Sequence, residues 1–279
     1  MIIYKTIEPL RIYVRKQKKE QKSIGFIPTM GALHAGHISL INTSTLNKHI
    51  TVCSIFINPT QFNNAADFNK YPVTIEKDIK QLEEAGCDIL FLPDKQTIYP
   101  PEFETQPFNL GYLEEILEGK YRPGHFQGVC QVVNRLLEII SPDVMFLGEK
   151  DYQQCMVIKK MAGHLFPHLQ IIVHNTLRET DGLAMSSRNL RLTLEERIKA
   201  PAIYKALKHI ADGSEVKKMN SLLQEARFIL SETGFRVEYL EIADADTLLP
   251  VSESSARKVI LIAAYLGDIR LIDNLVITS

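Results

Sequence analysis

Hydrophobic residues in the first 175 positions fall into short runs that alternate with longer amphipathic stretches. The short runs are largely apolar, as expected for strands buried on both faces of a parallel sheet, and they occupy residues 23–27, 50–57, 88–92, 143–147 and 169–173. Between them, apolar residues recur at helical spacing over about 36–47, 75–85, 127–140 and 151–165. This alternation predicts an α/β fold with a Rossmann-like, doubly wound parallel sheet.

The helix predicted at 75–85 carries signals at both ends. We expect Thr74 to be its N-cap, because a threonine hydroxyl can accept a hydrogen bond from a backbone N–H of the first turn. Glu76 and Asp78 would lie in that turn, where the helix dipole favours acidic side chains. Gly86 stands just past the expected end.

The pattern changes after about residue 175. A polar loop is followed by helical periodicity over about 194–211 and 219–233, and then by the β-rich segments FRVEYLEIAD and KVILIAAYL. We expect two domains, 1–175 and 176–279, of which the second is a smaller α+β domain. No long linker separates them, so we expect a short hinge and a narrow cleft, and such boundaries commonly hold ligands.

Composition narrows the class of protein. The 279 residues include 45% hydrophobic and 23% charged residues, which is typical of a globular chain. The 32 basic and 33 acidic residues give a formal net charge of −1, so no overall basic field favours nucleic acid, and the cluster RKQKKEQK is expected to be a solvated helix face. A small-molecule partner fits this balance better.

We expect a cytoplasmic protein without a membrane segment. No signal-peptide core is present at the N-terminus, and no apolar run approaches the ~20 residues needed to span a bilayer. The four cysteines are far apart and lack C-x-x-C spacing, which favours reduced thiols over a disulfide framework or a zinc ribbon.

The segment FIPTMGALHAGH places His34 and His37 between the carboxyl end of a predicted strand and the start of a predicted helix. Ligands bind there in open α/β sheets, and the unpaired N–H groups at a helix start favour an anion. Gly31 and Gly36 would let the backbone approach a phosphate, to which both imidazoles could donate hydrogen bonds. The alternatives are a metal site, for which no third ligand is nearby, and ordinary polar residues at a helix start.

A second motif, GLAMSSRN at 182–189, combines two hydroxyls with Arg188 beside a glycine. Such a loop can bind phosphate and close over it. A serine-rich loop carries little information alone, but it matches the expected far side of a nucleotide cleft.

Six segments together resemble the pantothenate synthetase family of the nucleotidyltransferase superfamily. They are PTMGALHAGH, FINPTQF, YRPGHFQGV, LGEKDYQQ, DGLAMSSRN and RLIDN, in the order that the family shows, and the resemblance runs from about residue 24 to 275. The chain departs from the family pattern at YPVT (71–74), at Gln131 and in GDIRLIDN, which affects only peripheral positions.

The resemblance implies an ATP-dependent ligase that condenses pantoate with β-alanine. The products would be pantothenate, AMP and pyrophosphate, formed through a pantoyl-adenylate with Mg²⁺, on the route to coenzyme A. It also implies that domain 1–175 binds nucleotide and pantoate, that domain 176–279 is a lid carrying the MSSR loop, and that the enzyme is a homodimer joined through the N-terminal domain.

The same resemblance assigns the site residues. His34, His37, Lys150 and Arg188 would be catalytic. ATP-binding residues would be Met30, Gly31, His34, Gly36, His37, Gly148, Lys150, Asp151, Leu177, Met185, Ser186, Ser187 and Arg188. Pantoate or β-alanine would contact Met30, Asn58, Gln61 and Gln154, and Asp78 would be a magnesium ligand.

For several of these residues a structural role competes with the functional one. Asn58 could cap the turn before Pro59, Asp151 could cap a helix, and Asp78 could simply be a first-turn charge. Arg122 and His125 could line the substrate entrance or anchor a loop. The alternative functions are an adenylyltransferase that stops at the nucleotidylated product and a non-catalytic nucleotide- or RNA-binding module.

Overall fold

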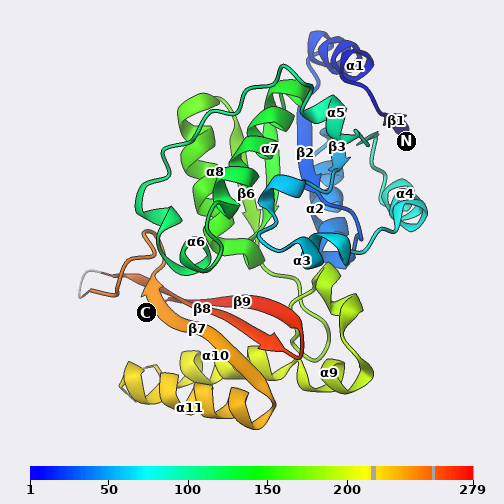
Figure 1. Ribbon diagram of the computed structural model, residues 1–279. Helices are drawn as coiled ribbons and strands as arrows, with labels where there is room; N and C mark the ends of the chain where they lie inside the picture. The colour runs from blue at the N-terminus through cyan, green and yellow to red at the C-terminus, as the bar shows by residue number, and fades with distance from the viewer. Residues whose placement is uncertain (215–217, 253–254, 279) are drawn as a thin grey trace. The chain divides into compact units, whose positions relative to one another are not determined.

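A computed structural model of the chain describes residues 1–214, 218–252 and 255–278 (Figure 1). The chain divides into two compact units, one formed by Met1–Glu149 with Gln153–Asn175 and the other by Lys150–Tyr152 with Thr176–Ser279. The sequence-based boundary at residue 175 left Lys150–Tyr152 in the first domain, whereas the structure groups these three residues with the second unit.

The first unit is built on a six-stranded sheet in the order β1-β4-β3-β2-β5-β6, in which every pair of neighbours is parallel. The strands are β1 (Ile2–Tyr4), β2 (Ile24–Thr29), β3 (Ile50–Ile55), β4 (Ile89–Phe91), β5 (Val144–Gly148) and β6 (Gln170–His174). The predicted doubly wound sheet is confirmed. The edge strand β1 was not predicted, because three residues are too few to show a period.

Helices connect and cover these strands (Figure 1). They are α1 (Ile7–Lys19), α2 (Ala35–Leu46), α3 (Ala65–Asn69), α4 (Ile75–Glu84), α5 (Lys95–Ile98), α6 (Leu117–Tyr121), α7 (His125–Ile140) and α8 (Tyr152–Leu165), with 3-10 turns η1 (Pro59–Gln61), η2 (Gly111–Glu114) and η3 (Glu149–Asp151). Helix α2 lies so close to the sheet that a Cβ on Gly25 would be 2.3 Å from Ser44 Oγ. A buried cluster that includes Ile27, Ile41 and Phe146 fills this interface.

The start of α4 differs from the expected cap. Thr74 occupies the N-cap position, but its side chain accepts no hydrogen bond from the helix backbone. Its hydroxyl instead donates to Asp78 Oδ1 at 3.0 Å. The N-cap side chain of α4 is therefore bonded to a side chain in the first turn of the helix, and not to its backbone.

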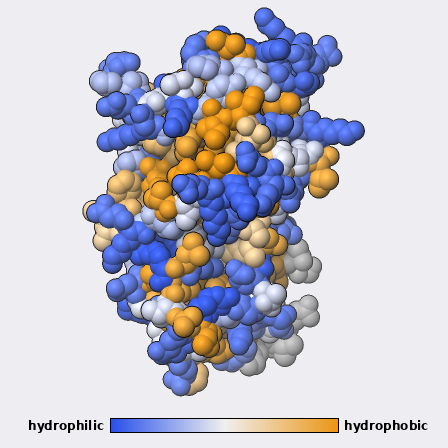
Figure 2. Space-filling model, turned by 90° about the vertical axis from the view of Figure 1, so that its right-hand side faces the viewer, coloured by the Kyte–Doolittle hydropathy of each residue, from blue (hydrophilic) through white to orange (hydrophobic). Residues whose placement is uncertain are grey.

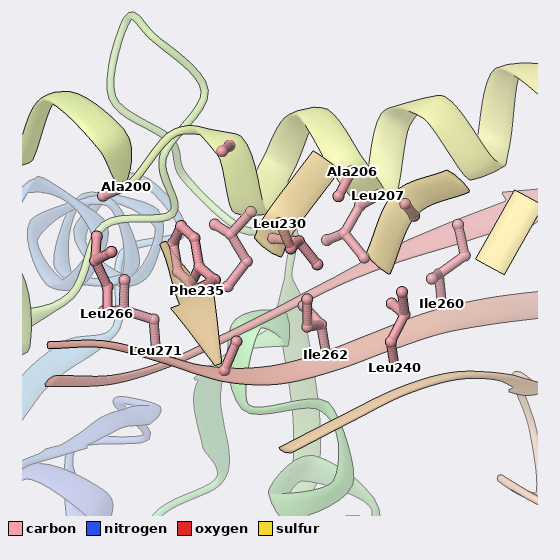
Figure 3. Close-up of a cluster of buried hydrophobic side chains, with 14 of the residues drawn as sticks. Ala200, Ala206, Leu207, Leu230, Phe235, Leu240, Ile260, Ile262, Leu266 and Leu271 are labelled. Atoms are coloured by element: carbon pink, nitrogen blue, oxygen red, sulfur yellow. The ribbon is translucent and has the colours of Figure 1, made fainter. Parts of the chain in front are cut away.

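The second unit is a three-stranded antiparallel sheet with helices, which confirms the predicted α+β class. Strands β7 (Phe235–Asp244), β8 (Arg257–Leu266) and β9 (Ile269–Thr278) pair in that order, and the helical elements are η4 (Ser187–Arg191), α9 (Leu194–Lys199), α10 (Ala202–Gly213) and α11 (Met219–Glu232). Figure 3 shows the core between α10, α11 and the sheet, in which Leu207, Leu230 and Ile262 are fully buried. Strand β9 was not predicted, because Arg270, Asp273 and Asn274 interrupt its apolar pattern.

The helix predicted over 194–211 is two helices. Helix α9 ends at Lys199 and α10 begins at Ala202, so the break falls at Ala200 and Pro201. Proline has no N–H to donate, and its ring crowds the preceding turn. The apolar periodicity continues across residues 200–201, so the pattern alone predicted one helix.

Candidate active site

The first unit presents two of the sequence motifs at the carboxyl edge of its sheet. Strand β2 has β3 on one side and β5 on the other, so the connections after β2 and β5 leave at the point where the strand order reverses. Open α/β sheets bind ligands at this point. Thr29 and Gly148 end the two strands, and a Cβ added to Gly148 would meet no heavy atom within 4 Å.

His34 and His37 form a close pair of tilted rings at the start of α2. Their ring centroids are 4.0 Å apart, and the backbone N–H of His34 donates to His37 Nδ1 at 3.4 Å. A His37 nitrogen that accepts this bond leaves the proton on Nε2, which can then donate to a ligand. The backbone N–H of His37 donates to His34 O at 2.8 Å, and the amino end of α2, where the helix dipole favours an anion, combines backbone and imidazole donors.

Asp78, predicted as a magnesium ligand, is fully buried, and its carboxylate faces the loop before α2. Oδ2 accepts a hydrogen bond from Ala32 N and Oδ1 accepts one from Leu33 N, both at 2.9 Å. No group of three or more His, Cys, Asp or Glu within the described part of the chain has an arrangement that could hold a metal ion. These contacts give Asp78 a role inside the protein, and none of them supports its role as a metal ligand, which stays a prediction.

Gln61 lies beside the first motif. Its Nε2 donates to Met30 Sδ at 2.9 Å, and its Oε1 accepts from Asn58 Nδ2 at 3.3 Å. Gln61 is 9% exposed, so its side chain is buried beside Met30. Gln61 and Met30, two of the four residues assigned by sequence to pantoate or β-alanine, are therefore in direct contact.

Asn58 has a different position. Its side chain is fully buried, donates to Gly128 O at 3.0 Å and accepts from the hydroxyls of Thr60 and Tyr99. It is also the N-cap of η1. The contacts support the structural alternative for Asn58, in which it caps the turn before Pro59, and its direct contact with pantoate stays a prediction.

Arg122 and His125 anchor the same turn. Both donate to the Gln61 carbonyl oxygen, at 3.3 Å from Nη2 and 2.8 Å from Nδ1. The Arg122 guanidinium also lies 2.9 Å from His125 Nε2, and because a guanidinium only donates, that nitrogen is the acceptor and Nδ1 carries the proton. The geometry thus supports the loop-anchoring role for both residues.

The two glutamines of LGEKDYQQ face different surroundings. Gln153 is 2% exposed and joins α8 to the η2–α6 region, donating to Leu113 O and Ile116 O and accepting from Glu118 N. Gln154, assigned to pantoate, is partly exposed. Sequence reasoning missed the structural role of Gln153, since adjacent identical residues give no signal of which one turns inward.

Lys150 and Asp151 belong to the second unit. The Lys150 backbone carbonyl accepts a hydrogen bond from Asn274 Nδ2 at 2.9 Å, and Nζ lies 3.6 Å from Asp151 Oδ1. Tyr152 donates its hydroxyl proton to Ala245 O at 2.7 Å. The segment that carries the predicted phosphate-binding lysine is thus attached to β9 by Asn274 of the RLIDN motif.

The MSSR loop is shaped by a short antiparallel pairing. Met185 N donates to Leu177 O at 3.0 Å, which brings the two apolar residues predicted to bind ATP opposite one another. Ser186 then caps η4 by accepting from Arg188 N at 3.3 Å, while Ser187 is 6% exposed. Two hydroxyls and one guanidinium are therefore held within a single turn.

Arg178 and Asp273 hold this pairing to the sheet, and sequence reasoning missed both. Arg178 binds the Asp273 carboxylate through two nitrogens, at 2.6 and 3.0 Å, and its guanidinium lies 4.0 Å from the ring centroid of Tyr204. Burial raises the pKa of Asp273, and the hydrogen bonds from Arg178 partly offset that increase. The Arg-x-x-Asp-Gly sequence alone does not reveal that its arginine is paired with β9.

A doubly wound parallel sheet whose switch point carries an imidazole pair at the start of a helix has the architecture of a nucleotide-binding α/β enzyme. The sequence profile described as pantoate-beta-alanine ligase matches residues 2–276. The chain therefore belongs to the pantoate–beta-alanine ligase family.

Individual relatives agree with this membership. The chain is 44% identical over 284 residues to a pantothenate synthetase of Cytophaga hutchinsonii, with 99% of each chain covered. A crystal structure of pantothenate synthetase from Thermus thermophilus is similar with a TM-score of 0.92 and 38% identity, covering 99% of each chain. A pantoate-beta-alanine ligase from Francisella tularensis, complexed with beta-gamma ATP and beta-alanine, gives a TM-score of 0.82 and 39% identity over 99% of this chain and 97% of that one.

Proposed function

We propose that the protein condenses pantoate with β-alanine in a reaction driven by ATP, giving pantothenate, AMP and pyrophosphate. The observation that carries this proposal is the contact between Gln61 and Met30, because it joins the residues assigned to the organic acid to the loop that leads to His34 and His37. Membership of the family and the Francisella relative with beta-alanine support the same reaction.

In the first step a pantoate carboxylate oxygen attacks the α-phosphorus of ATP, and the bond to the pyrophosphate oxygen breaks. Two anions must approach each other, so the main tasks are alignment and neutralisation of charge. His34, His37, Lys150, Ser186, Ser187 and Arg188 would donate to the phosphate oxygens. We propose Mg²⁺ as the cation that accompanies ATP and shares this charge.

In the second step the amine of β-alanine attacks the acyl carbon of the pantoyl-adenylate, and AMP leaves with the electron pair of the broken C–O bond. The neutral amine loses one proton as it becomes the amide nitrogen, and solvent, a phosphate oxygen of the leaving AMP or His37 would accept that proton. Gln61 can donate to one oxygen of the acid and accept from a hydroxyl, which would keep the acyl group in place during both steps.

The direct test is product analysis with ATP, Mg²⁺, pantoate and β-alanine. We expect pantothenate and AMP in equal amounts. Formation of ADP would contradict the adenylate route. Release of pyrophosphate with accumulation of the nucleotidylated acid, and with no dependence on β-alanine, would favour an adenylyltransferase that stops at that product.

Substitutions test the assigned roles. His37→Ala and Lys150→Ala should each slow adenylate formation by roughly 10²-fold or more, because each removes a donor aimed at developing charge. Gln61→Ala should mainly raise the KM for pantoate. His164→Ala and Lys159→Ala, at exposed positions of α8, are matched controls that should retain wild-type turnover. Unchanged turnover in the first two variants would contradict the proposal.

We also propose a cytoplasmic homodimer joined through the first unit. Ile2, Ile3 and Ile12 of this unit are 43%, 41% and 60% exposed, and β1 is an edge strand. Figure 2 shows hydrophobic residues gathered in patches among hydrophilic ones on one face of the protein. No helix among the residues that the structure describes has the length and hydrophobicity needed to cross a membrane. Sedimentation would test the oligomeric state.

A further inference from the structure

The loop between β2 and α2 has an unusual backbone. Gly31 has a φ of +80° and Ala32 has a φ of +49°, so two consecutive residues adopt left-handed conformations. A non-glycine residue in this region is strained, and the conformation persists only where the surrounding contacts stabilise it. His34 follows two residues later, which makes this loop the support of the histidine pair.

The carboxylate of Asp78, on helix α4, stabilises this loop conformation. Asp78 is fully buried on α4, and it accepts hydrogen bonds from two successive amides, Ala32 N and Leu33 N, one to each oxygen. Hydrogen bonds to an ionised acceptor are roughly twice as strong as neutral ones. A Cβ on Gly31 would lie 3.1 Å from Asp78 Oδ2, so the carboxylate sits directly against the loop.

The contacts then lead to the histidines. Leu33 N is fixed by Asp78, the next residue is the extended N-cap His34, and His34 N donates to His37 Nδ1. We propose that Asp78 is a positioning residue, which sets the direction of His34 and His37 toward the triphosphate through the backbone of residues 31–33. This inference rests on the proposed function of the histidine pair and adds a residue that acts on ATP without touching it.

Thr74 provides a matched control. Its hydroxyl donates to Asp78 Oδ1 at 3.0 Å, so Thr74→Val removes one hydrogen bond from the same carboxylate but leaves both loop amides with their acceptor. Asp78→Asn keeps the shape of the side chain but places an NH₂ group opposite one of the two amide donors. Asp78→Asn therefore disturbs the hydrogen bonds that the loop amides donate, whereas Thr74→Val leaves them in place.

The first experiment measures ATP–pyrophosphate exchange in the presence of pantoate, well below the melting temperature of each variant. We expect Asp78→Asn to lower kcat/KM for ATP by about tenfold or more, since displacements of about 1 Å can cost as much as 10²-fold, whereas Thr74→Val stays within about twofold of the wild type. If Asp78→Asn melts earlier but keeps the wild-type kcat and KM, Asp78 is only structural and the proposal is overturned.

A double-mutant cycle tests the route of the effect. If Asp78 acts through the histidine pair, then adding Asp78→Asn to His37→Ala should cost much less than it does in the wild type. Fully multiplicative losses would mean that the two residues act independently, and they would contradict the positioning role.

Amide hydrogen exchange separates this inference from the proposed function. The amides of Ala32 and Leu33 should exchange faster in Asp78→Asn than in Thr74→Val, whatever reaction the protein catalyses. If the wild-type protein makes no pantothenate, the proposed function is wrong, but the effect of Asp78 on the loop amides can still be tested. If amide exchange is unchanged in Asp78→Asn, the positioning role of Asp78 is wrong, whatever the reaction is.

Discussion

Four amide side chains of the first unit look alike in sequence but have two kinds of surroundings. Asn58 and Gln153 are 0% and 2% exposed, with all their contacts inside the protein. Gln61 is also buried, at 9% exposed, whereas Gln154 is partly exposed. Sequence patterns identify the motifs but not which amide of each faces inward, because that depends on packing against distant segments.

Gly31 provides a prediction at the scale of one residue. Gly31→Ala should lower the free energy of unfolding by about 1–3 kcal/mol, because φ is +80° and the new methyl group would lie 3.0 Å from Ile55 Cγ2. Denaturant titration measures this loss. Gly148→Ala, where a Cβ meets nothing within 4 Å, is the control for stability and should unfold at nearly the wild-type denaturant concentration.

At the scale of elements, the contact between α7 and η1 fixes the acid-binding turn. A Cβ on Gly128 would be 2.5 Å from Thr60 O, so only glycine allows α7 to approach the turn that carries Gln61. His125, the first residue of α7, and Arg122, which follows α6, both donate to the Gln61 carbonyl oxygen. The sequence predicted the helix, but its contact with η1 joins residues about 65 positions apart.

Replacing this glycine tests the contact. Gly128→Ala should destabilise the protein by about 1–3 kcal/mol through overpacking and should raise the KM for pantoate, because the turn with Gln61 must move. Gly163→Ala on α8, with no atom within 4 Å of the new Cβ, is the matched helix control and should be neutral or slightly stabilising. Wild-type pantoate affinity in a folded Gly128→Ala protein would contradict this placement of the acid site.

At the scale of the whole molecule, each unit has its own core, and the residues of one motif are shared between the units. Gly148 belongs to the first unit, whereas Lys150 and Asp151 belong to the second. All four cysteines are free and buried in the first unit, which agrees with the expectation of reduced thiols. Burial raises the pKa of Cys87 and of Cys130 to about 12.

The raised pKa values of these two thiols predict that the protein becomes less stable at alkaline pH. Below the pKa of about 8.5 for an unfolded thiol, Cys87 and Cys130 are neutral in both states and their contribution is fully present. Above that pKa the thiol ionises in the unfolded chain but stays neutral in the folded protein. Each of the two thiols should therefore lower the free energy of unfolding by about 1 kcal/mol by pH 9.5. Melting temperatures between pH 7.5 and 9.5 measure this fall. A Cys87→Ala/Cys130→Ala variant should show a smaller fall, and an equal one would contradict the assignment.

The sequence by itself determined the alternation of strands and helices, the α+β character of the second unit and the six motifs, because periodicity and turn chemistry are local. Tertiary structure alone decided the strand order, the inward turn of Asn58 and Gln153, and the attachment of Lys150 to Asn274. It also decided that Asp78 binds loop amides 45 and 46 positions away. These features depend on which distant backbone groups reach a side chain once the chain is packed, and no local pattern encodes that.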